Sequence, residues 1–220
     1  MLIKLDEIFE NYDISIKGIL HVGAHAAEES NDYQRLGVNR VIWVEANPSM
    51  MMPLMETTAH LPGNSYHWFA AHETDGDVVE LNIASNGESS SILDFDTHLI
   101  EHPHVKMVQK IKVPTRRIDT FILSSGYDPD CFNFLNLDIQ GAELIALRGM
   151  TGILDSVQYV YTEINEKSLY KGCCLAKELD DFLAEHGFTR YATHMTPFGW
   201  GDAFYAKEGN SSWPIIDRLE

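Results

Sequence analysis

Residues 132–150 read FNFLNLDIQGAELIALRGM, and this segment decides the fold class. A run of apolar and β-favouring residues ends at Asp138, and Gly141 follows shortly after. A helical pattern then begins with Glu143 in its first turn, so the order predicts a buried strand that turns tightly into a helix. In open α/β folds the ligand crevice lies at the carboxyl ends of the strands, which places Asp138 at the rim of that crevice.

Both acids of this segment also have a purely structural explanation. Asp138 could cap the following helix, and Glu143 could complement the helix dipole. Capping accounts for one acid, but it does not require the whole order of strand, acid, glycine and second acid. We therefore expect a functional role for Asp138.

Strands and helices alternate along the rest of the chain. Apolar or alternating patterns predict strands at 18–25, 40–47, 65–72, 78–85, 157–165, 188–195 and 202–208, with the strand at 78–85 beside that at 65–72. Helices are predicted at 1–13, 27–37, 48–59 and 175–186, and residues 110–126 predict a strand followed by a helix. The predicted fold is α/β: one doubly wound, mostly parallel Rossmann-like sheet with helices on both faces and an antiparallel C-terminal hairpin, in a single domain spanning 1–220.

Composition and charge restrict the classes of function. Apolar residues make up 45% of the chain, which excludes a disordered protein. The formal net charge is −17, from 33 acids against 16 Lys and Arg, so a nucleic-acid partner or an anionic membrane surface is not expected. An acidic protein could accept a cationic cofactor, although acidity is also a route to solubility.

The predicted location is the cytoplasm. No stretch approaches the roughly 18 apolar residues that span a bilayer, and the first residues carry acids and lack a signal-peptide cleavage region. The cysteines, Cys131, Cys173 and Cys174, are odd in number and two are adjacent, so a disulfide framework is not expected.

The turn after the first strand discriminates between cofactors. Gly23 would let the backbone approach a ligand, and Glu45 lies 22 residues further on, at the end of the second strand, where it could accept both hydroxyls of a ribose. The alternative is a solvent-facing glutamate. Residues 23–28 contain one glycine where a dinucleotide fingerprint has three, and Glu28 and Glu29 would oppose a phosphate. S-adenosylmethionine carries cationic groups and no phosphate, so an acidic rim suits it better than NAD or FAD.

Five segments together resemble the FkbM family of methyltransferases. They are GILHVGAHAAEES at 18–30, VEAN at 44–47, SSSI at 89–92, LDIQGAELIALRGM at 137–150 and YTEIN at 161–165, in the order expected of that family. The resemblance implies a class I methyltransferase fold and S-adenosylmethionine as cofactor. It further implies O-methylation of a hydroxyl on a sugar, a glycan or another small metabolite.

The resemblance also assigns roles to the cofactor-binding residues. Gly23, Ala24 and His25 would contact the methionine part of the cofactor, while Glu45, with Ala46 and Asn47, would hold the ribose. Ser91 and its neighbouring serines could hydrogen-bond the cofactor, although serines after Asn86-Gly87 also fit an ordinary loop.

The predicted catalytic residues are Asp138, Glu143 and Glu163. Asp138 would face the cofactor or the acceptor, Glu143 would brace the turn, and Glu163 is a candidate base that could instead be satisfied by a neighbouring helix start. His21 stands where the family more often has an acid, so it is expected to be a packed histidine. Residues 86–108 are expected to form a variable loop or short helices near the acceptor site, and Trp200 is either a wall of that pocket or an exposed hairpin tip.

No metal is predicted, although two groups of residues could suggest one. Asp138, Glu163 and Asn165 offer oxygen ligands, but hard-cation sites usually need more of them. His98 and His102 would share a helix face, but Pro103 interrupts the pattern and a further ligand is missing.

An S-adenosylmethionine-dependent O-methyltransferase is therefore the leading hypothesis. The second is a non-catalytic protein of the same fold that binds S-adenosylmethionine or adenosine, and the third is an NAD-dependent oxidoreductase. The expected partner is a small-molecule or glycan acceptor, which the sequence does not identify.

Overall fold

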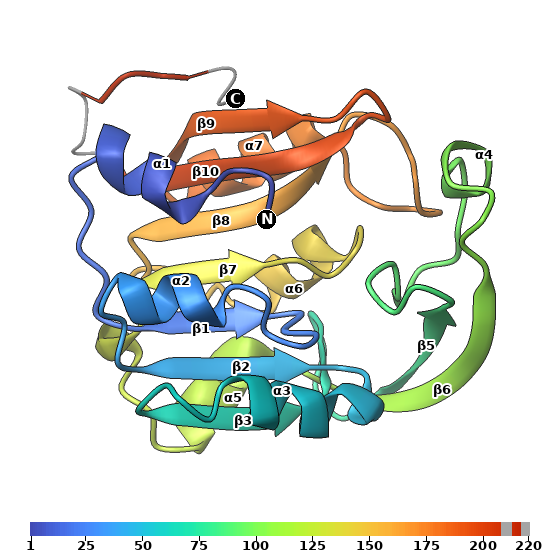
Figure 1. Ribbon diagram of the computed structural model, residues 1–220, viewed down its shortest axis with the longest axis horizontal. Helices are drawn as coiled ribbons and strands as arrows, with labels where there is room; N and C mark the ends of the chain where they lie inside the picture. The colour runs from blue at the N-terminus through green and yellow to red at the C-terminus, as the bar shows by residue number, and fades with distance from the viewer. Residues whose placement is uncertain (208–212, 217–220) are drawn as a thin grey trace.

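The computed structural model describes residues 1–207 and 213–216, so residue 208, the predicted end of the last strand, lies outside the described part. Its main sheet has seven strands in the order β3-β2-β1-β7-β8-β10-β9 (Figure 1). The bounds are β1 Ile19–Val22, β2 Val41–Glu45, β3 Asn64–Trp68, β7 Phe134–Leu137, β8 Tyr159–Asn165, β9 Phe188–Met195 and β10 Trp200–Lys207. The first five in this spatial order are parallel, and β10 pairs antiparallel with both β8 and β9. The predicted mostly parallel sheet with an antiparallel C-terminal hairpin is confirmed.

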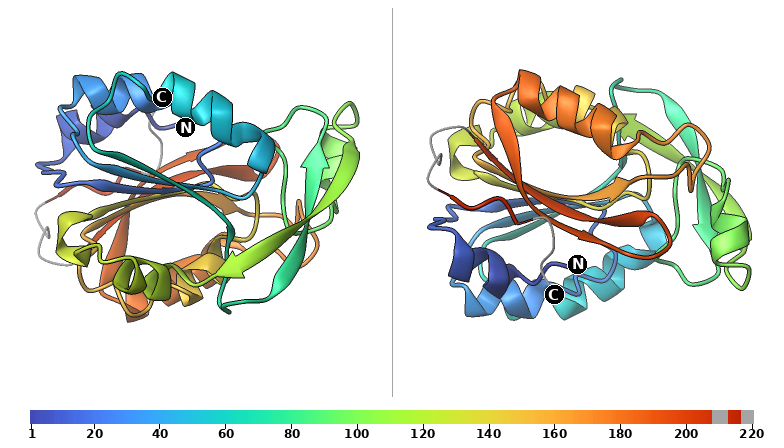
Figure 2. Two further views of the ribbon diagram at one scale, coloured as in Figure 1. Left: turned by 90° about the horizontal axis from the view of Figure 1, so that it is seen from below. Right: turned by 90° about the horizontal axis from the view of Figure 1, so that it is seen from above.

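Helices cover both faces of this sheet, as the alternation of strands and helices predicted (Figure 2). One face carries α1 Leu5–Asn11, α2 Ser30–Arg35 and α3 Met51–Thr57, the last preceded by the 3-10 turn η1 Pro48–Met50. The other face carries α5 Ile118–Ser124, α6 Glu143–Arg148 and α7 Ala176–Glu185. The short α4 His98–Glu101 and the 3-10 turn η2 Pro129–Cys131 complete the helical elements.

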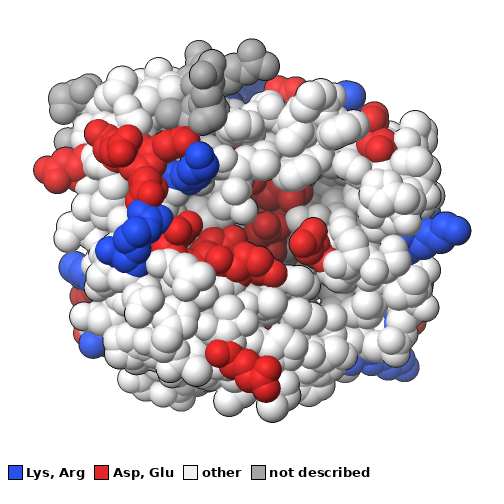
Figure 3. Space-filling model, viewed as in Figure 1, with Lys and Arg blue, Asp and Glu red and all other residues white. Residues whose placement is uncertain are grey.

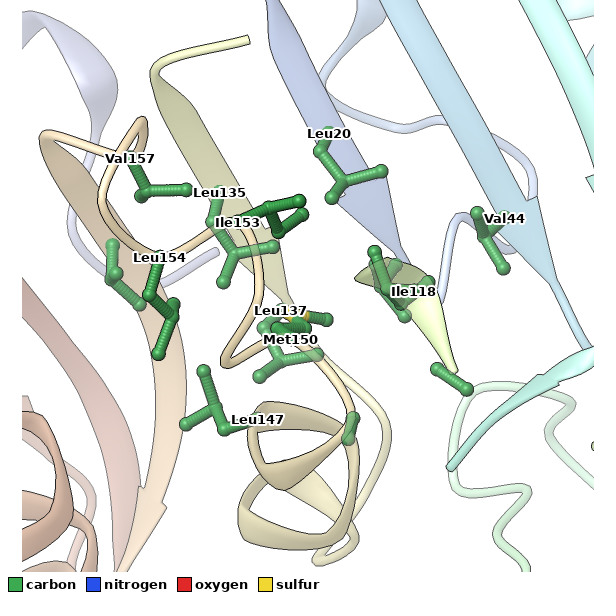
Figure 4. Close-up of a cluster of buried hydrophobic side chains, with 14 of the residues drawn as sticks. Leu20, Val44, Ile118, Leu135, Leu137, Leu147, Met150, Ile153, Leu154 and Val157 are labelled. Carbon is green, nitrogen blue, oxygen red and sulfur yellow. The ribbon is translucent and has the colours of Figure 1, made fainter. Parts of the chain in front are cut away.

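The side chains of the central strands divide between two cores. In β2, Val41 and Trp43 pack with the helices of the first face, while Ile42 and Val44 pack with those of the second. Side chains of a strand alternate between faces, so a strand covered on both sides needs an apolar residue at every position. Figure 4 shows the second core, in which Leu135 of β7 lies among side chains from several elements.

One strand lies in a different place from the one predicted. The segment 78–85 was expected beside the segment 65–72, but β5 Val78–Ala84 pairs antiparallel with β6 Met107–Arg116. A second sheet has the order β4-β6-β5, with β4 Ala70–Ala71 as its third strand. Several side chains of β5 are exposed, and a half-exposed strand suits an arm outside the main sheet rather than a doubly covered position. This arm lies beyond the carboxyl ends of the parallel strands (Figure 1).

The segment 86–108 contains the short helix α4 and the start of β6, with irregular structure between β5 and α4. It therefore has the short helical character that its composition predicted. Within residues 1–207 and 213–216, no helix combines the length and the apolar character that a bilayer span requires.

Leu135 tests the core between the sheet and the second group of helices. Its side chain is 0% exposed, so Leu135→Ala is expected to lower the free energy of unfolding by about 3–5 kcal/mol, through lost burial and a residual cavity. Leu123→Ala is the matched control, because Leu123 on α5 is 60% exposed and should cost less than about 0.5 kcal/mol. Urea denaturation of both variants measures the difference, and equal losses would contradict this description of the core.

Candidate functional site

The carboxyl ends of four parallel strands bring the predicted site residues to one edge of the sheet. The register pairs Val22 of β1 with Leu137 of β7, and Leu137 with Thr162 of β8. The residues that follow in each strand, Gly23, Asp138 and Glu163, are consequently neighbours at the rim. This is the edge at which open α/β sheets bind ligands.

Gly23 forms the tight turn that the sequence predicted. Its φ is +86°, and a Cβ at this position would overlap the carbonyl oxygen of Asp138. Its N–H donates to the carbonyl of Val44 at 2.9 Å, and that of Ala24 donates to the same carbonyl at 3.1 Å. Only glycine combines this backbone conformation with such a close approach. The side chain of Ala24 is buried in the first core, so only its backbone belongs to the turn.

Glu45 ties the ends of β1 and β2 together. One carboxylate oxygen accepts from the N–H of His25 at 2.7 Å, and the other accepts from the N–H of Asn47 at 2.6 Å. Burial raises the pKa of Glu45, against the effect of these hydrogen bonds. The side chain is almost fully buried but still lines a recess, and each oxygen keeps a lone pair beyond its one backbone hydrogen bond.

A glutamine to which the sequence assigned no role connects two of the three candidate catalytic acids, Asp138 and Glu163. The Gln140 amide donates to Asp138 Oδ1 and to Glu163 Oε2, both at 2.7 Å. Its own oxygen accepts from the hydroxyl of Tyr170 at 2.6 Å. Asn165 donates to the other oxygen of Glu163 at 3.2 Å. Gln140 has a φ of +57°, which turns its side chain back across the strand ends and holds both acids.

The acids of the rim hold protons more tightly than isolated carboxylates. Asp138 has an exposed side chain but lies in a recess, and the surrounding protein together with the charge of Asp202 raises its pKa to about 6. Glu163 is 5% exposed, and burial together with Asp138 raises its pKa well above the usual range. Carboxyl groups whose pKa is shifted toward neutrality are suited to proton transfer, and they mark functional sites.

Glu143 lies behind the turn rather than in the recess. Its side chain is fully buried, and Oε1 accepts from the N–H groups of Ile139 and Gly141, each at 3.1 Å. The other oxygen has no hydrogen-bond partner within residues 1–207 and 213–216. Burial raises the pKa of Glu143 to about 7. Two roles were predicted for Glu143: to brace the turn and to act as a catalytic residue. Its contacts are those of a residue that braces the turn.

Two further predicted residues have their polar atoms committed within the protein. The hydroxyl of Ser91 donates to the carbonyl of Gln140 at 2.7 Å, so Ser91 holds the loop 86–97 against the rim. His21 is buried, its Nδ1 lies 3.0 Å from the hydroxyl of Tyr33, and burial lowers its pKa to about 3. It has the contacts of the packed histidine that was expected.

Two cavities meet at the rim. A recess of about 70 Å³ is bounded by Gly23, Glu45, Ala46, Asn47, Ser91 and Asp138, with apolar walls from β4 and β5. A larger cavity of about 420 Å³ lies next to it, bounded by residues that include Glu163, Tyr170 and Trp200. Gly23, His25, Glu88, Asp138 and Gln140 line both. Figure 3 shows Asp and Glu side chains gathered in and around a hollow on this face.

Neither group of potential metal ligands forms a metal centre among residues 1–207 and 213–216, where no set of three His, Cys, Asp or Glu could hold an ion. The rings of His98 and His102 are 4.9 Å apart, and those of His102 and His104 are 6.2 Å apart. His98 lies in α4, which ends before His102. All three histidines line the larger cavity. Trp200 lines it too, so of the two expected positions, a pocket wall or an exposed hairpin tip, it occupies a pocket wall.

Three residues of the site had no role in the sequence reading: Gln140, Tyr170 and Asp202. Gln140 stands inside the segment 132–150, between the acid and the glycine, so its position offered a signal. Asp202 is brought beside Glu163 only by the antiparallel pairing of β10 with β8. That pairing depends on a register that no local pattern specifies.

Comparisons with known proteins place the chain among methyltransferases. A family model described as the Methyltransferase FkbM domain matches residues 21–190. The 2-O-methyltransferase NoeI of Sinorhizobium fredii (strain NBRC 101917 / NGR234) is 30% identical over 109 residues, which are 50% of this chain and 42% of that protein. The chain thus matches less than half the length of this relative.

A solved structure shares the fold. The ribosomal protein L11 methylase from Lactobacillus delbrueckii subsp. bulgaricus superposes with a TM-score of 0.51 at 10% sequence identity, covering 93% of this chain and 76% of that chain. The similarity extends over nearly the whole chain, so it concerns the overall fold.

Glu143 gives a test of the buried turn through pH. Its folded-state pKa of about 7 exceeds the ordinary value of 4.5, so its contribution to stability is present at low pH and is lost as pH rises toward 7. Glu143→Gln keeps an acceptor oxygen and cannot ionise. Between about pH 4.5 and pH 7.5, the wild type should therefore lose on the order of 2 kcal/mol relative to the variant. Urea denaturation across this range measures the difference, and parallel stability curves would contradict the burial of an ionising Glu143.

Proposed function

We propose that this chain, which belongs to the FkbM family of S-adenosylmethionine-dependent methyltransferases, transfers the methyl group of that cofactor to a hydroxyl oxygen of a sugar, a glycan or another small metabolite. The family, recognised from five short segments, is confirmed by the match over 21–190. The observation that carries the proposal is the position of Asp138, which lies where the recess and the larger cavity meet.

The smaller recess suits the cofactor. Glu45 presents a carboxylate at the end of β2, where a ribose with two hydroxyls would find an acceptor. Apolar side chains such as Phe69 and Leu81 line the same recess and suit an adenine ring. At the other end, the backbone of Gly23 and the carboxylate of Asp138 suit the cationic methionine part. The absence of a second glycine in the turn continues to disfavour a pyrophosphate.

Asp138 is the better candidate base. When bound, the cofactor supplies an electrophilic methyl group on a sulfonium, and the acceptor oxygen must lose a proton as it forms the new bond. Asp138 lies at the junction with a pKa of about 6, which leaves it largely ionised at neutral pH and still able to take up that proton. Glu163 is nearly buried and accepts hydrogen bonds at both oxygens, which favours a supporting role.

A hydroxyl acceptor is supported by the relative NoeI, whose name describes a 2-O-methyltransferase. The sheet edge adds a physical reason, because carboxylates and amides at the junction can accept and donate hydrogen bonds to hydroxyl groups. The cytoplasmic location and the exclusion of nucleic-acid and membrane partners stay predictions from composition.

Glu45 tests the cofactor assignment. Glu45→Ala removes the proposed ribose acceptor and should weaken binding of S-adenosylhomocysteine by about 10- to 100-fold, the value of a hydrogen-bonded charged group. Titration calorimetry of the wild type should show binding of this compound and none of NAD or ATP. Glu56→Ala, which changes an exposed glutamate of α3, is the matched control and should bind normally. Tighter binding of NAD would refute the assignment in favour of an oxidoreductase.

Asp138 tests the transfer step. Wild-type protein incubated with S-adenosylmethionine and a panel of sugars should yield a product heavier by one methylene group, identified by mass spectrometry. Asp138→Asn should lower the rate by about 100- to 10,000-fold through loss of the base, with S-adenosylhomocysteine affinity changed only a few-fold. Unchanged turnover in the variant would exclude Asp138 as the base. Tight cofactor binding with no product from any acceptor would favour the non-catalytic binding protein instead.

A further inference from the structure

We infer that the acceptor carries an amino group in addition to the hydroxyl that is methylated, so that it is an amino sugar or a similar hydroxylated amine. This inference rests on the proposed function and concerns the cavity of about 420 Å³ on the far side of the junction. Six carboxylates line that cavity: Glu28, Glu29, Glu88, Asp138, Glu163 and Asp202. No Lys or Arg side chain of the described residues lines it.

The acids fall into two groups, those that line both cavities and those that line only the larger one. Glu88 and Asp138 line both cavities and can face the cationic part of the cofactor. Glu28, Glu29, Glu163 and Asp202 line only the larger one. Their negative charge therefore belongs to the larger cavity, which the proposed function leaves to the acceptor.

Two of these acids accept hydrogen bonds from neutral donors, although the amino group of Met1 lies near one of them, Asp202. Asp202 is 5% exposed and accepts from the hydroxyl of Tyr161 and the N–H of Leu2, which are neutral donors. Glu163 accepts only from the amides of Gln140 and Asn165. Buried carboxylates are costly, and here Asp138 and Asp202 also raise the pKa of Glu163. An ammonium group beside Asp202 would offset that cost.

The other two acids have positive partners. Glu28 is paired with His25 Nδ1 at 2.7 Å, and Glu29 lies 3.6 Å from the amino group of Met1. Burial opposes the charge of that amino group, but Asp202, Glu29 and Asp138 outweigh burial and raise its pKa. Carboxylates are therefore in excess over cationic groups in this part of the cavity lining.

The aromatic part of the cavity lining suits a hydroxylated ring. His98, His102, Tyr170 and Trp200 form it, and aromatic faces of this kind pack against the apolar face of a sugar. His98 is 4% exposed, and its Nδ1 has no hydrogen-bond partner. Buried polar atoms without partners are rare in folded proteins, so the polar groups of this part of the lining are incompletely satisfied. A ring with hydroxyl groups and one amine matches both the acidic and the aromatic residues of the lining. A phosphorylated or carboxylated sugar would be repelled by the acids.

Three matched probes test the inference by calorimetry on protein saturated with S-adenosylhomocysteine: the methyl glycosides of glucosamine, N-acetylglucosamine and glucuronic acid. The amine should bind at least about tenfold more tightly than its acetylated form, and the acid should not bind detectably. Asp202→Asn should reduce this preference to about threefold or less. Glu185→Gln, at an exposed position of α7, is the control and should keep it.

The saturation step separates failure of this inference from failure of the proposed function. Suppose that S-adenosylhomocysteine binds normally. Equal affinities for the amine and the acetylated probe, tighter binding of the acid, or no binding of any probe would then overturn the inference that the acceptor carries an amino group. Absence of S-adenosylhomocysteine binding would overturn the proposed function and the inference with it. If circular dichroism shows that Asp202→Asn does not fold, Glu163→Gln replaces it, with the same loss of preference expected.

Discussion

The close backbone approach between Gly23 and Asp138 is the constraint on which the site depends. A side chain at position 23 would overlap the carbonyl of Asp138, so the turn after β1 and the end of β7 can touch only because this residue is glycine. The same turn directs the N–H of His25 to Glu45 at 2.7 Å. One contact therefore sets the relative positions of the recess that contains Glu45 and of Asp138, the candidate base.

The carboxylates that this geometry brings together are a cost to the folded protein. Asp138, Glu143 and Glu163 all have raised pKa values, chiefly because burial disfavours their charged forms. Neutral donors, above all the amide of Gln140, hold two of them without neutralising them. Acids arranged in this way would be eliminated if stability were the only requirement, since replacing them by neutral groups removes the cost. The presence of Asp138 and Glu163 at one cavity is what a cationic cofactor and acceptor would explain.

The parts of the site that are local in sequence could be predicted, and those that depend on register could not. The order of strand, Asp138, Gly141 and Glu143 within 132–150 specified both the fold class and the rim, because each feature has a local cause. The placement of 78–85 was wrong because alternation identifies a half-buried strand but does not identify its partner, which is β6. Asp202 had no signal at all, because only the pairing of β10 with β8 brings it beside Glu163.

The most direct test of the account is a crystal structure of the protein with S-adenosylhomocysteine bound. The account predicts the ribose hydroxyls on Glu45 and the sulfur at the junction beside Asp138, with the cavity bounded by Tyr170 and Trp200 left open for the acceptor. Adenosine in that larger cavity, or a sulfur remote from Asp138, would contradict the central claim that methyl transfer takes place across the junction of the two cavities.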